Sequence, residues 1–168
     1  MKKYALLLGT SRYSGNTSSL INVVAKEIEI TQFHLKDYQI SAFDYEHKNI
    51  DDDFISLVLE LLDYEHIIFA SPVYWYSMSA EMKVFFDRLS DLLHVKKELG
   101  RKLRTKSCSI ISTGASALPE RSFEEVFINS FKYLGMDYMG MLYSFCDGDF
   151  TVKGNEENIK TYIGALQS

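Results

Sequence analysis

Short apolar segments alternate with amphipathic segments along almost the whole chain. The apolar segments are bounded by polar or turn-forming residues and predict β-strands over 4–8, 32–35, 66–70, 107–112 and 138–145. Between and after them, hydrophobic residues recur with the spacing of one helix face, which predicts α-helices over 18–29, 53–63, 79–93, 120–134 and 156–166. The pattern therefore predicts five consecutive strand–helix units.

The order of these elements predicts the fold class. Repeated strand–helix units with continuously apolar strands are typical of an α/β protein whose parallel sheet is covered by helices on both faces. Right-handed crossovers favour the doubly wound strand order 2-1-3-4-5, in which the loops after the first and third strands flank the ligand-binding switch point. With 168 residues and 46% apolar content, the chain is expected to form a single domain, residues 1–168.

The loop after the first predicted strand, residues 9–19, consists largely of hydroxyl, amide and glycine residues. Asn16 or Thr17 is expected to cap the following helix, and the free N–H groups of its first turn attract an anion. Arg12 adds a positive charge. The loop lacks the Gly-Lys-[Ser/Thr] end of a P-loop and the Gly-x-Gly-x-x-Gly spacing of a dinucleotide site. It therefore indicates a phosphate monoester site, and the alternative is a capped turn whose polar residues only face water.

Three adjacent aromatic residues follow the third predicted strand, in the segment Ser71-Pro72-Val73-Tyr74-Trp75-Tyr76. This segment lies at the carboxyl end of the strand, which is the edge where open α/β sheets bind ligands. We expect the three rings to form a flat wall against which a planar cofactor packs. The predicted strand order brings this wall next to the phosphate loop, so the two motifs are expected to form one site.

Together these motifs resemble those of the flavodoxin-like NAD(P)H-dependent FMN reductase family. The family's Gly-Ser-x-Arg-x-x-Gly-Asn-Thr loop corresponds here to residues 9–17, with Thr10 replacing the usual serine and keeping its hydroxyl. Its Ser-Pro-x-Tyr-Trp segment corresponds to residues 71–75, and its Lys-x-Phe-x-Asp-Arg segment to residues 83–88. The order and spacing of the elements match along nearly the whole chain. The resemblance therefore implies a flavodoxin-like fold.

The resemblance also implies a cofactor site for FMN. Its phosphate would bind to Thr10, Ser11, Arg12, Asn16, Thr17 and Ser18, and its isoalloxazine ring would lie against Pro72, Val73, Tyr74, Trp75 and Tyr76. The far edge of the ring would lie near Thr113, Gly114 and Ala115, which match by position only. Because hydride chemistry belongs to the flavin, no catalytic side chain is expected.

The activity implied by the resemblance is hydride transfer from NADPH or NADH, through FMN, to a small acceptor such as a flavin, quinone, nitro or azo compound. Two other functions stay open at this point. A flavodoxin-type electron carrier has the same fold and cofactor but no nicotinamide chemistry, and a binding module, with or without FMN, can use the same scaffold.

Charge and cysteine content narrow the class of partner. The 18 basic and 23 acidic residues give a net charge of −5, which argues against a nucleic-acid partner. Cys108 and Cys146 lack the spacing of a metal or redox site and are expected to be buried thiols. Residues 36–52 contain no cysteine, which excludes the family variant that holds an iron–sulfur cluster there.

The first apolar run is too short for a signal peptide and no segment is long enough to cross a membrane, so we expect a cytoplasmic protein.

Other charged groups are expected to have structural roles. Asp51, Asp52 and Asp53 precede a helix and suit its N-terminus, and the histidines at 34, 47, 66 and 94 occur singly, so no metal site is predicted. The basic residues between 96 and 106 are expected to form a solvated loop at the sheet edge opposite the site. Lys83 and Asp87 are spaced as a weak surface pair, and Arg88 beside them is assigned a structural role.

Self-association is predicted from apolar content. The predicted helix 79–93 has more apolar residues than one core-facing side needs, and the segment 36–52 contains Tyr38, Phe43 and Tyr45. Large unpartnered apolar surfaces are typical of subunit interfaces. We therefore expect a homodimer or homotetramer.

Overall fold

The computed structural model describes residues 2–168. Its strands are β1 (Tyr4–Leu8), β2 (Ile30–His34), β3 (His66–Ala70), β4 (Ser107–Gly114) and β5 (Asp137–Phe145). Its α-helices are α1 (Asn16–Val24), α2 (Phe54–Leu61), α3 (Ala80–Arg88), α4 (Asp91–His94), α5 (Lys97–Lys102), α6 (Arg121–Leu134) and α7 (Glu156–Gln167). Two short 3-10 turns, η1 (Leu35–Asp37) and η2 (Leu103–Thr105), follow β2 and α5.

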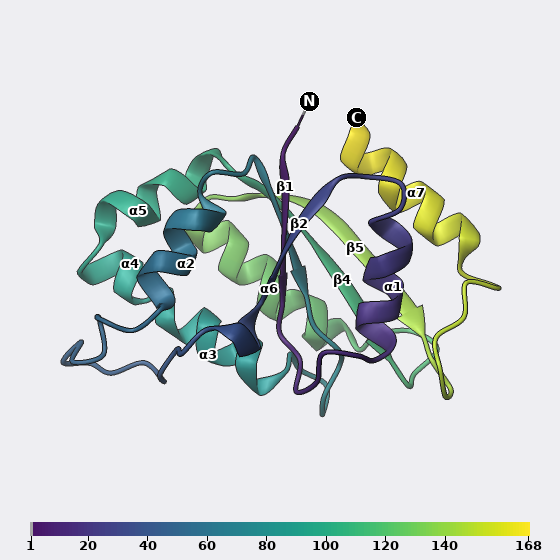
Figure 1. Cartoon of the computed structure of the whole chain (residues 1–168), viewed down its shortest axis with the longest axis horizontal. Helices are drawn as coiled ribbons and strands as arrows, with labels where there is room; N and C mark the ends of the chain where they lie inside the picture. The colour runs from purple at the N-terminus through teal and green to yellow at the C-terminus, as the bar shows by residue number, and fades with distance from the viewer. Residues whose placement is uncertain (1) are drawn as a thin grey trace.

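The five strands form one parallel sheet in the order β2-β1-β3-β4-β5. This arrangement confirms the predicted fold class and strand order. Leu8, the last residue of β1, pairs with His34 of β2 and Ala70 of β3. Because all the strands run in the same direction, the loops that leave their carboxyl ends gather at one edge of the sheet, which is at the bottom of Figure 1.

Helices cover both faces of the sheet (Figure 1). On one face, Leu6 and Leu8 of β1 belong to the core that packs beneath α1 and α7. On the other face, Ala5 and Leu7 belong to a larger core beneath α2, α3 and α6. Successive strand residues point to opposite faces, so a strand that is covered on both sides must be apolar throughout. This is why β1 and β3 are buried along their whole lengths.

Several boundaries differ from the predicted ones, and in each case packing gives the reason. Helix α1 begins at Asn16 and ends at Val24, because the chain must turn back to start β2 at Ile30, opposite Tyr4 of β1. The predicted helix 79–93 is divided into α3 and α4, since the N–H groups of Leu89 and Ser90 bond to carbonyls three residues back and tighten the chain there.

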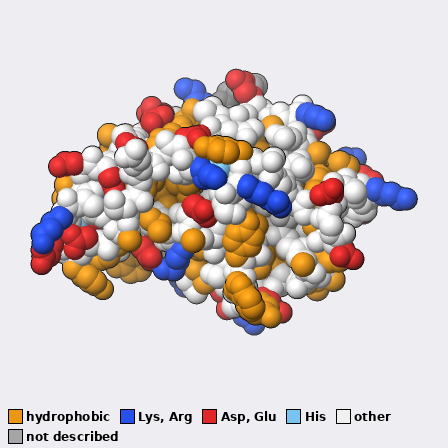
Figure 2. Space-filling view, turned by 60° about the horizontal axis from the view of Figure 1, so that its bottom comes forward, with side chains coloured by type: hydrophobic (Ala, Val, Ile, Leu, Met, Phe, Trp, Pro, Cys, Tyr) orange, Lys and Arg blue, Asp and Glu red, His pale blue; other side chains and the backbone are white. Residues whose placement is uncertain are grey.

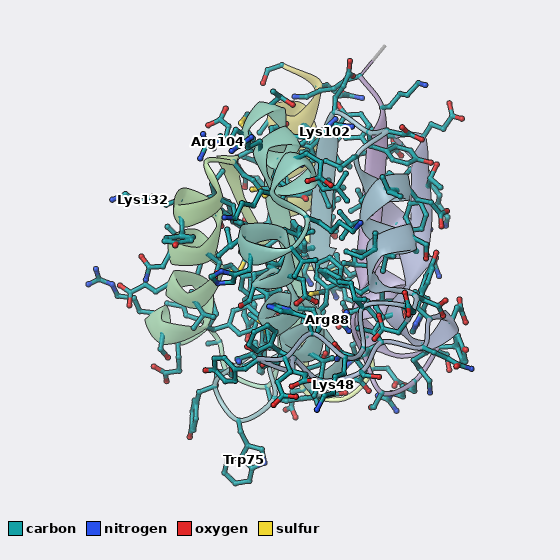
Figure 3. The ribbon with its side chains drawn as sticks, turned by 90° about the vertical axis from the view of Figure 1, so that its left-hand side faces the viewer. Lys48, Trp75, Arg88, Lys102, Arg104 and Lys132 are labelled. Atoms are coloured by element: carbon teal, nitrogen blue, oxygen red, sulfur yellow. The ribbon has the colours of Figure 1, made fainter. Side chains whose placement is uncertain are left out.

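The basic segment 96–106 is a helix, α5, followed by η2, so the prediction of a loop was wrong. Leu99 and Leu103 on one side of this segment are buried and anchor it to the core. The location was predicted correctly: Lys102 and Arg104 lie at the end of the molecule opposite Trp75 (Figure 3). No helix within residues 2–168 is long and apolar enough to cross a membrane.

Burial changes the argument for self-association. Met82, Phe85, Leu89 and Leu92 of the 79–93 region, and Met78 just before it, are all buried in the core of this single chain. The extra apolar residues of this region therefore pack against α2, α6 and the sheet, and they give no support to a dimer.

Cys108 and Cys146 are free and buried, which confirms the expectation of buried thiols.

Arg88 is a completely buried cation that holds the segment after η1 in place. Its Nε donates to Asp91 at 2.6 Å, and its Nη1 donates to the carboxylate of Asp52 and to the Ser41 carbonyl. Asp52 also accepts the N–H of Phe54 at 3.0 Å, so this aspartate satisfies an N–H group at the start of α2 as predicted. Asp53, at the N-cap position, makes no side-chain cap hydrogen bond and accepts the N–H of Gln39 instead, so the capping prediction was wrong for it. Burial opposes the charge of Asp52, but hydrogen bonds from Arg88 and backbone N–H groups bring the pKa of Asp52 below its ordinary value. Arg88 is thus structural as predicted, but it lies in the interior.

Candidate functional site

Two adjoining cavities lie at the carboxyl edge of the sheet, between the loops that follow β1, β3, β4 and β5. The first has a volume of about 170 Å³ and is lined by Thr10, Arg12, Gly15, Asn16, Thr17, Ser18, Pro72, Val73, Tyr74, Thr113, Gly114, Ala115 and Cys146. The second has a volume of about 210 Å³ and is lined by Val73, Trp75, Tyr76, Gly114, Ala115, Ser116, Pro119, Glu120 and Tyr143. The structure therefore brings together every residue predicted for the cofactor except Ser11.

The first cavity contains the N-terminus of α1. The residue before this helix is Gly15, and no side chain caps the first turn, so the prediction that Asn16 or Thr17 caps it was wrong. The N–H groups of that turn are consequently available to an anion. A Cβ placed on Gly15 would lie 2.9 Å from Nε of Arg12, so a side chain at this position would displace the guanidinium. None of the ion pairs within residues 2–168 includes Arg12.

The side chains of Asn16 and Thr17 join the loops to one another. Asn16 donates from Nδ2 to the Gly148 carbonyl at 2.7 Å and accepts the Phe150 N–H at Oδ1 at 3.0 Å. Thr17 Oγ1 lies 2.7 Å from Thr113 Oγ1 in the interior. These contacts tie the start of α1 to the loops after β4 and β5. Both residues line the cavity, but their side-chain polar atoms already have partners within the protein.

A bracing cluster on the outer side of the first loop was not predicted. Lys36 donates from Nζ to the Ser11 carbonyl at 2.7 Å, and its ammonium lies 5.0 Å from the centre of the Tyr13 ring. The Tyr13 hydroxyl donates to Asp37 Oδ1 at 2.7 Å, and its ring packs on His34 at 4.6 Å. Residues 34–37 at the end of β2 therefore hold the backbone of the first loop. No local motif signals this contact, because the two segments are about two dozen residues apart.

The loop after β3 is a tight projecting turn, so the expectation of a flat aromatic wall was wrong. Tyr74 and Ser77 exchange two backbone hydrogen bonds of 2.9 and 3.0 Å across Trp75 and Tyr76. Trp75 is 93% exposed and extends away from the body of the protein (Figure 3). Tyr74 faces the first cavity, with its hydroxyl 3.4 Å from Ser11 Oγ. Tyr74 thus lines the first cavity, whereas Trp75 and Tyr76 line the second.

Two buried serines connect the first and third loops. Ser79 caps α3 by accepting the Met82 N–H, and its hydroxyl donates to the Gly9 carbonyl at 2.8 Å. The N–H of Ser79 in turn donates to Ser71 Oγ at 2.9 Å. A Cβ on Gly9 would lie 2.8 Å from the Met82 side chain, so glycine is required for this close approach. The spacing between the two loops is therefore set by direct contacts.

The floor of the second cavity depends on Gly114. A Cβ at this position would lie 2.7 Å from the Tyr143 hydroxyl and 3.3 Å from Val73. The Tyr143 hydroxyl donates to the Ser116 carbonyl at 2.6 Å and so holds the loop after β4. Burial raises the pKa of Tyr143 and that of the Cys146 thiol, which keeps both groups neutral at ordinary pH. A flat ligand can approach the backbone here because no side chain stands on Gly114.

These features fit a planar cofactor that ends in a phosphate. Uncapped N–H groups and Arg12 suit the phosphate, and the open surface over Gly114 suits a ring. Figure 2 shows orange hydrophobic side chains exposed on the surface of the molecule. The large exposed hydrophobic residues in the loops after β1 and β3 are Tyr13, Tyr74, Trp75 and Tyr76. Within residues 2–168, no group of three His, Cys, Asp or Glu side chains is arranged to hold a metal ion.

The fold and the two cavities define a doubly wound α/β protein with a candidate cofactor site at its switch point. A family model described as NADPH-dependent FMN reductase matches residues 2–149. The chain therefore belongs to the NADPH-dependent FMN reductase family, which confirms the resemblance seen in the sequence. It is an NAD(P)H-dependent oxidoreductase whose cofactors are FMN and a reduced nicotinamide.

Individual proteins that are similar to this chain are consistent with this family assignment. YwqN of Bacillus subtilis strain 168, a candidate NAD(P)H-dependent FMN-containing oxidoreductase, is 28% identical over 152 residues, covering 82% of each protein. The structure of the Trp repressor binding protein from Bacillus subtilis has a TM-score of 0.79 at 21% identity, covering 98% of this chain and 97% of that one. An FMN-dependent NADH-azoreductase from Bacillus anthracis, solved with FMN, has a TM-score of 0.70 at 10% identity and 98% coverage of both chains. The two structures confirm the flavodoxin-like fold.

Proposed function

We propose that the protein transfers a hydride from NADH or NADPH, through FMN, to a small acceptor such as a free flavin, quinone, nitro or azo compound. The observation that carries this proposal is the pair of adjoining cavities, of which the first contains Arg12 and the uncapped start of α1 and the second lies over Gly114. FMN supplies the hydride-accepting and hydride-donating chemistry when it is bound. The protein supplies binding, orientation and an accessible ring face.

The phosphate would bind at the start of α1. Its negative charge would be neutralised by Arg12 and by the backbone N–H groups that no side chain caps. Thr10 and Ser18 contribute hydroxyls that line the same cavity. Asn16 and Thr17 would act mainly by holding the loops in register, since their polar atoms are engaged elsewhere. Ser11 would help to hold the loop in place, because its carbonyl accepts a hydrogen bond from Lys36.

The ring would lie over Gly114 and beside Val73, in the second cavity. Tyr143 would hold the adjacent loop through the Ser116 carbonyl, and Thr113 and Ala115 would present backbone groups at the ring edge. Tyr74 would close the side of the cavity that faces the first loop. We assign no side chain to proton or hydride transfer, because none is needed beyond the cofactor.

Flavin titration and reduction test this proposal. Flavin-free protein is titrated with FMN, FAD and riboflavin, and FMN should bind most tightly because the first cavity is built for a terminal phosphate. The FMN complex is then mixed anaerobically with NADH or NADPH, and the yellow absorbance should bleach without a helper reductase. Equal affinity for riboflavin would contradict the phosphate site. Binding without bleaching by either nicotinamide would favour an electron carrier or an FMN-binding module.

We also propose a cytoplasmic location and self-association as a homodimer or homotetramer. Two free, buried cysteines suit a reducing compartment. Exposed aromatic side chains, among them Tyr45 and Trp75, support self-association. Gel filtration with light scattering measures the molar mass in solution and so tests the proposed self-association.

A further inference from the structure

A further pocket, separate from the candidate cofactor site, lies between the segment 41–50 and helices α3 and α4. Its volume is about 560 Å³, and it is lined by Ala42, Phe43, Tyr45, His47, Asp87, Ser90 and His94. None of these residues lines either cavity of the cofactor site. The proposed function therefore leaves this pocket unexplained, although its volume is that of a site for a small molecule.

Three aromatic rings meet at nearly right angles on one side of this pocket. The Phe43 ring lies 5.0 Å from the Tyr45 ring, with 71° between their planes, and 5.8 Å from the His47 ring, with 73° between their planes. Tyr45 is 89% exposed, so the protein itself covers little of this ring. The faces of such rings carry negative charge density and attract cations. The aromatic side of the pocket therefore favours a positively charged ligand group.

The charge of the pocket favours the same kind of ligand. Asp87 supplies a carboxylate, and no lysine or arginine of the described chain is among the lining residues. Oδ1 of Asp87 accepts from Lys83 Nζ at 2.6 Å, but the two side chains are 47% and 53% exposed. Exposed ion pairs contribute little free energy, so a ligand cation can replace Lys83 beside this carboxylate.

His47 adds a hydrogen-bond acceptor to the pocket. Its Nδ1 lies 2.7 Å from Oδ1 of the buried Asp91, whose other carboxylate oxygen accepts from Arg88. Because a carboxylate only accepts, Nδ1 is the donor, and in the neutral imidazole Nε2 is then an acceptor. No hydrogen bond of this Nε2 occurs within residues 2–168. A hydroxyl or N–H group of a ligand can therefore donate to it.

The turn that carries His47 is fixed by Asp44. The two carboxylate oxygens of Asp44 accept the N–H groups of Glu46 and Lys48, each at 3.1 Å, and its carbonyl accepts the His47 N–H at 2.9 Å. The hydrogen bonds from Glu46 and Lys48 also lower the pKa of Asp44, which keeps this carboxylate ionised. His47 has a left-handed φ of 54°, a conformation that persists only where surrounding contacts hold it and that collects at ligand sites.

The ends of the same segment are anchored in the interior. Arg88 donates to the Ser41 carbonyl at 3.0 Å and to the Asn49 carbonyl at 3.3 Å. Figure 3 shows Arg88 within the molecule and Lys48, which belongs to this segment, below it at the surface. A pocket that already has its shape loses less conformational entropy on binding than a loop that must first become ordered. The aromatic rings and His47 are therefore in place before a ligand arrives.

We propose that this pocket binds a small organic cation, a quaternary or protonated amine that also carries a hydroxyl or N–H donor. The ammonium group packs against Phe43 and Tyr45 near the Asp87 carboxylate, and the donor bonds to Nε2 of His47. Aromatic side chains are a common means by which proteins hold quaternary ammonium groups. The site is distinct from the flavin site, and the proposal does not depend on hydride transfer.

Choline is a suitable probe, because it has a quaternary ammonium group and one hydroxyl. It is titrated into the protein at pH 8, and the ring-proton NMR signals of the four histidines are followed. Choline should bind saturably with a dissociation constant of about 1 mM or lower. The signals of His47 and His94 should shift, and those of His34 and His66 should stay unchanged. The same result is expected with FMN-saturated and flavin-free protein, which separates this site from the cofactor site.

Two related probes separate the contributions of charge and hydroxyl. The uncharged isostere 3,3-dimethylbutan-1-ol keeps the shape and the hydroxyl of choline, and it should bind about tenfold more weakly because it lacks the charge. Tetramethylammonium keeps the charge without a donor and should bind about threefold more weakly than choline. Equal affinity for choline and its uncharged isostere would overturn the cation site. Equal affinity for choline and tetramethylammonium would overturn the hydrogen bond to His47.

Variants at Asp87 and Lys83 test the role of the carboxylate. Asp87→Asn keeps the shape of the side chain and removes its charge, so choline affinity should fall about tenfold while that of the isostere stays the same. Lys83→Met removes the competing ammonium group and should raise choline affinity about threefold. Unchanged choline affinity in Asp87→Asn would overturn the assignment of this carboxylate.

Variants at Tyr45 test the aromatic wall. Tyr45→Leu should lower choline affinity about fivefold to tenfold, and Tyr45→Phe, which keeps the ring, should retain it. Tyr133→Ala is the matched control, because Tyr133 is 76% exposed on α6 and does not line the pocket. Urea unfolding should show that all variants are folded, since the altered side chains are exposed. Absence of saturable binding to the wild type up to about 50 mM choline, or histidine shifts outside the pocket alone, would overturn the proposal.

Discussion

His66 makes the stability of this fold depend on pH in a predictable direction. The side chain is fully buried at the start of β3, with Nδ1 2.8 Å from Ser107 Oγ and Nε2 2.7 Å from Ser109 Oγ. Ser109 Oγ in turn lies 2.6 Å from the Tyr162 hydroxyl of α7. Burial, aided by the charge of Lys2, lowers the pKa of His66 from 6.5 to about 4. The folded protein therefore holds this imidazole neutral at pH values where the unfolded chain would protonate it.

The sign and size of the effect follow from the two pKa values. Between pH 6.5 and 4 the unfolded state binds more protons, so lowering the pH favours unfolding. The contribution of His66 to stability is complete above pH 6.5 and is lost progressively as the pH falls through this range. At pH 4.5 the loss from this one group is about 2.5 kcal/mol. That is a large share of the stability of an ordinary domain.

Urea unfolding at several pH values between 8 and 4.5 measures this effect. The His66→Gln variant lacks the titrating group, so its free energy of unfolding should fall by about 2.5 kcal/mol less than that of the wild type over this range. Comparing the two chains cancels the contribution of the carboxylates. His94→Gln, at an exposed position on α4, is the control and should follow the wild type. Equal pH dependence of the wild type and His66→Gln would refute the reasoning.

Three further predictions concern the cofactor site and the buried ion cluster, and one concerns kinetics. Arg12→Ala removes a charge-assisted hydrogen bond worth about 1.5–3 kcal/mol, so FMN affinity should fall roughly ten- to a hundredfold while riboflavin affinity barely changes; equal losses in a flavin titration would mean that Arg12 acts through structure. Gly114→Ala places a Cβ 2.7 Å from the Tyr143 hydroxyl, so FMN and riboflavin should both bind roughly tenfold more weakly in the same titration; unchanged riboflavin affinity would exclude a ring over this glycine. Arg88→Ala removes the guanidinium beside the buried Asp91, which keeps only His47 as a side-chain partner, and should lower the free energy of unfolding by about 3–5 kcal/mol in urea. Lys83→Ala is the exposed control and should cost under about 1 kcal/mol; similar losses in both would contradict the assignment. Reduced nicotinamide and acceptor are expected to use one flavin face in turn, so double-reciprocal plots at several acceptor concentrations should be parallel, whereas intersecting lines would indicate a ternary complex.

The strand–helix order, the sheet topology and the loops that line the two adjoining cavities could be predicted from the sequence alone. Residues 67–70 had to be apolar because the strand is covered on both faces, and this requirement is visible without coordinates. The handedness of crossovers then left few strand orders. The loops at 9–17 and 71–76 were identifiable because a phosphate site and a ring site need particular residue types at neighbouring positions, and these motifs are local in the sequence.

The partners of individual polar side chains were decided only by the tertiary structure. Asn16 suits a helix cap by its chemistry, yet it bonds to Gly148 and Phe150, which the fold brings beside it from the other end of the chain. The sequence predicted a structural role for Arg88. Its burial depends on the segment 41–52, which supplies the Ser41 carbonyl and the Asp52 carboxylate as its hydrogen-bond partners.

The direction of Trp75 likewise follows from a turn that places two aromatic residues at left-handed φ, a conformation that residue preferences argue against. Local sequence determines backbone preference, hydrogen-bonding capacity and the period of burial. Which groups actually meet depends on segments distant in sequence, because only the packed sheet and helices bring them within bonding distance.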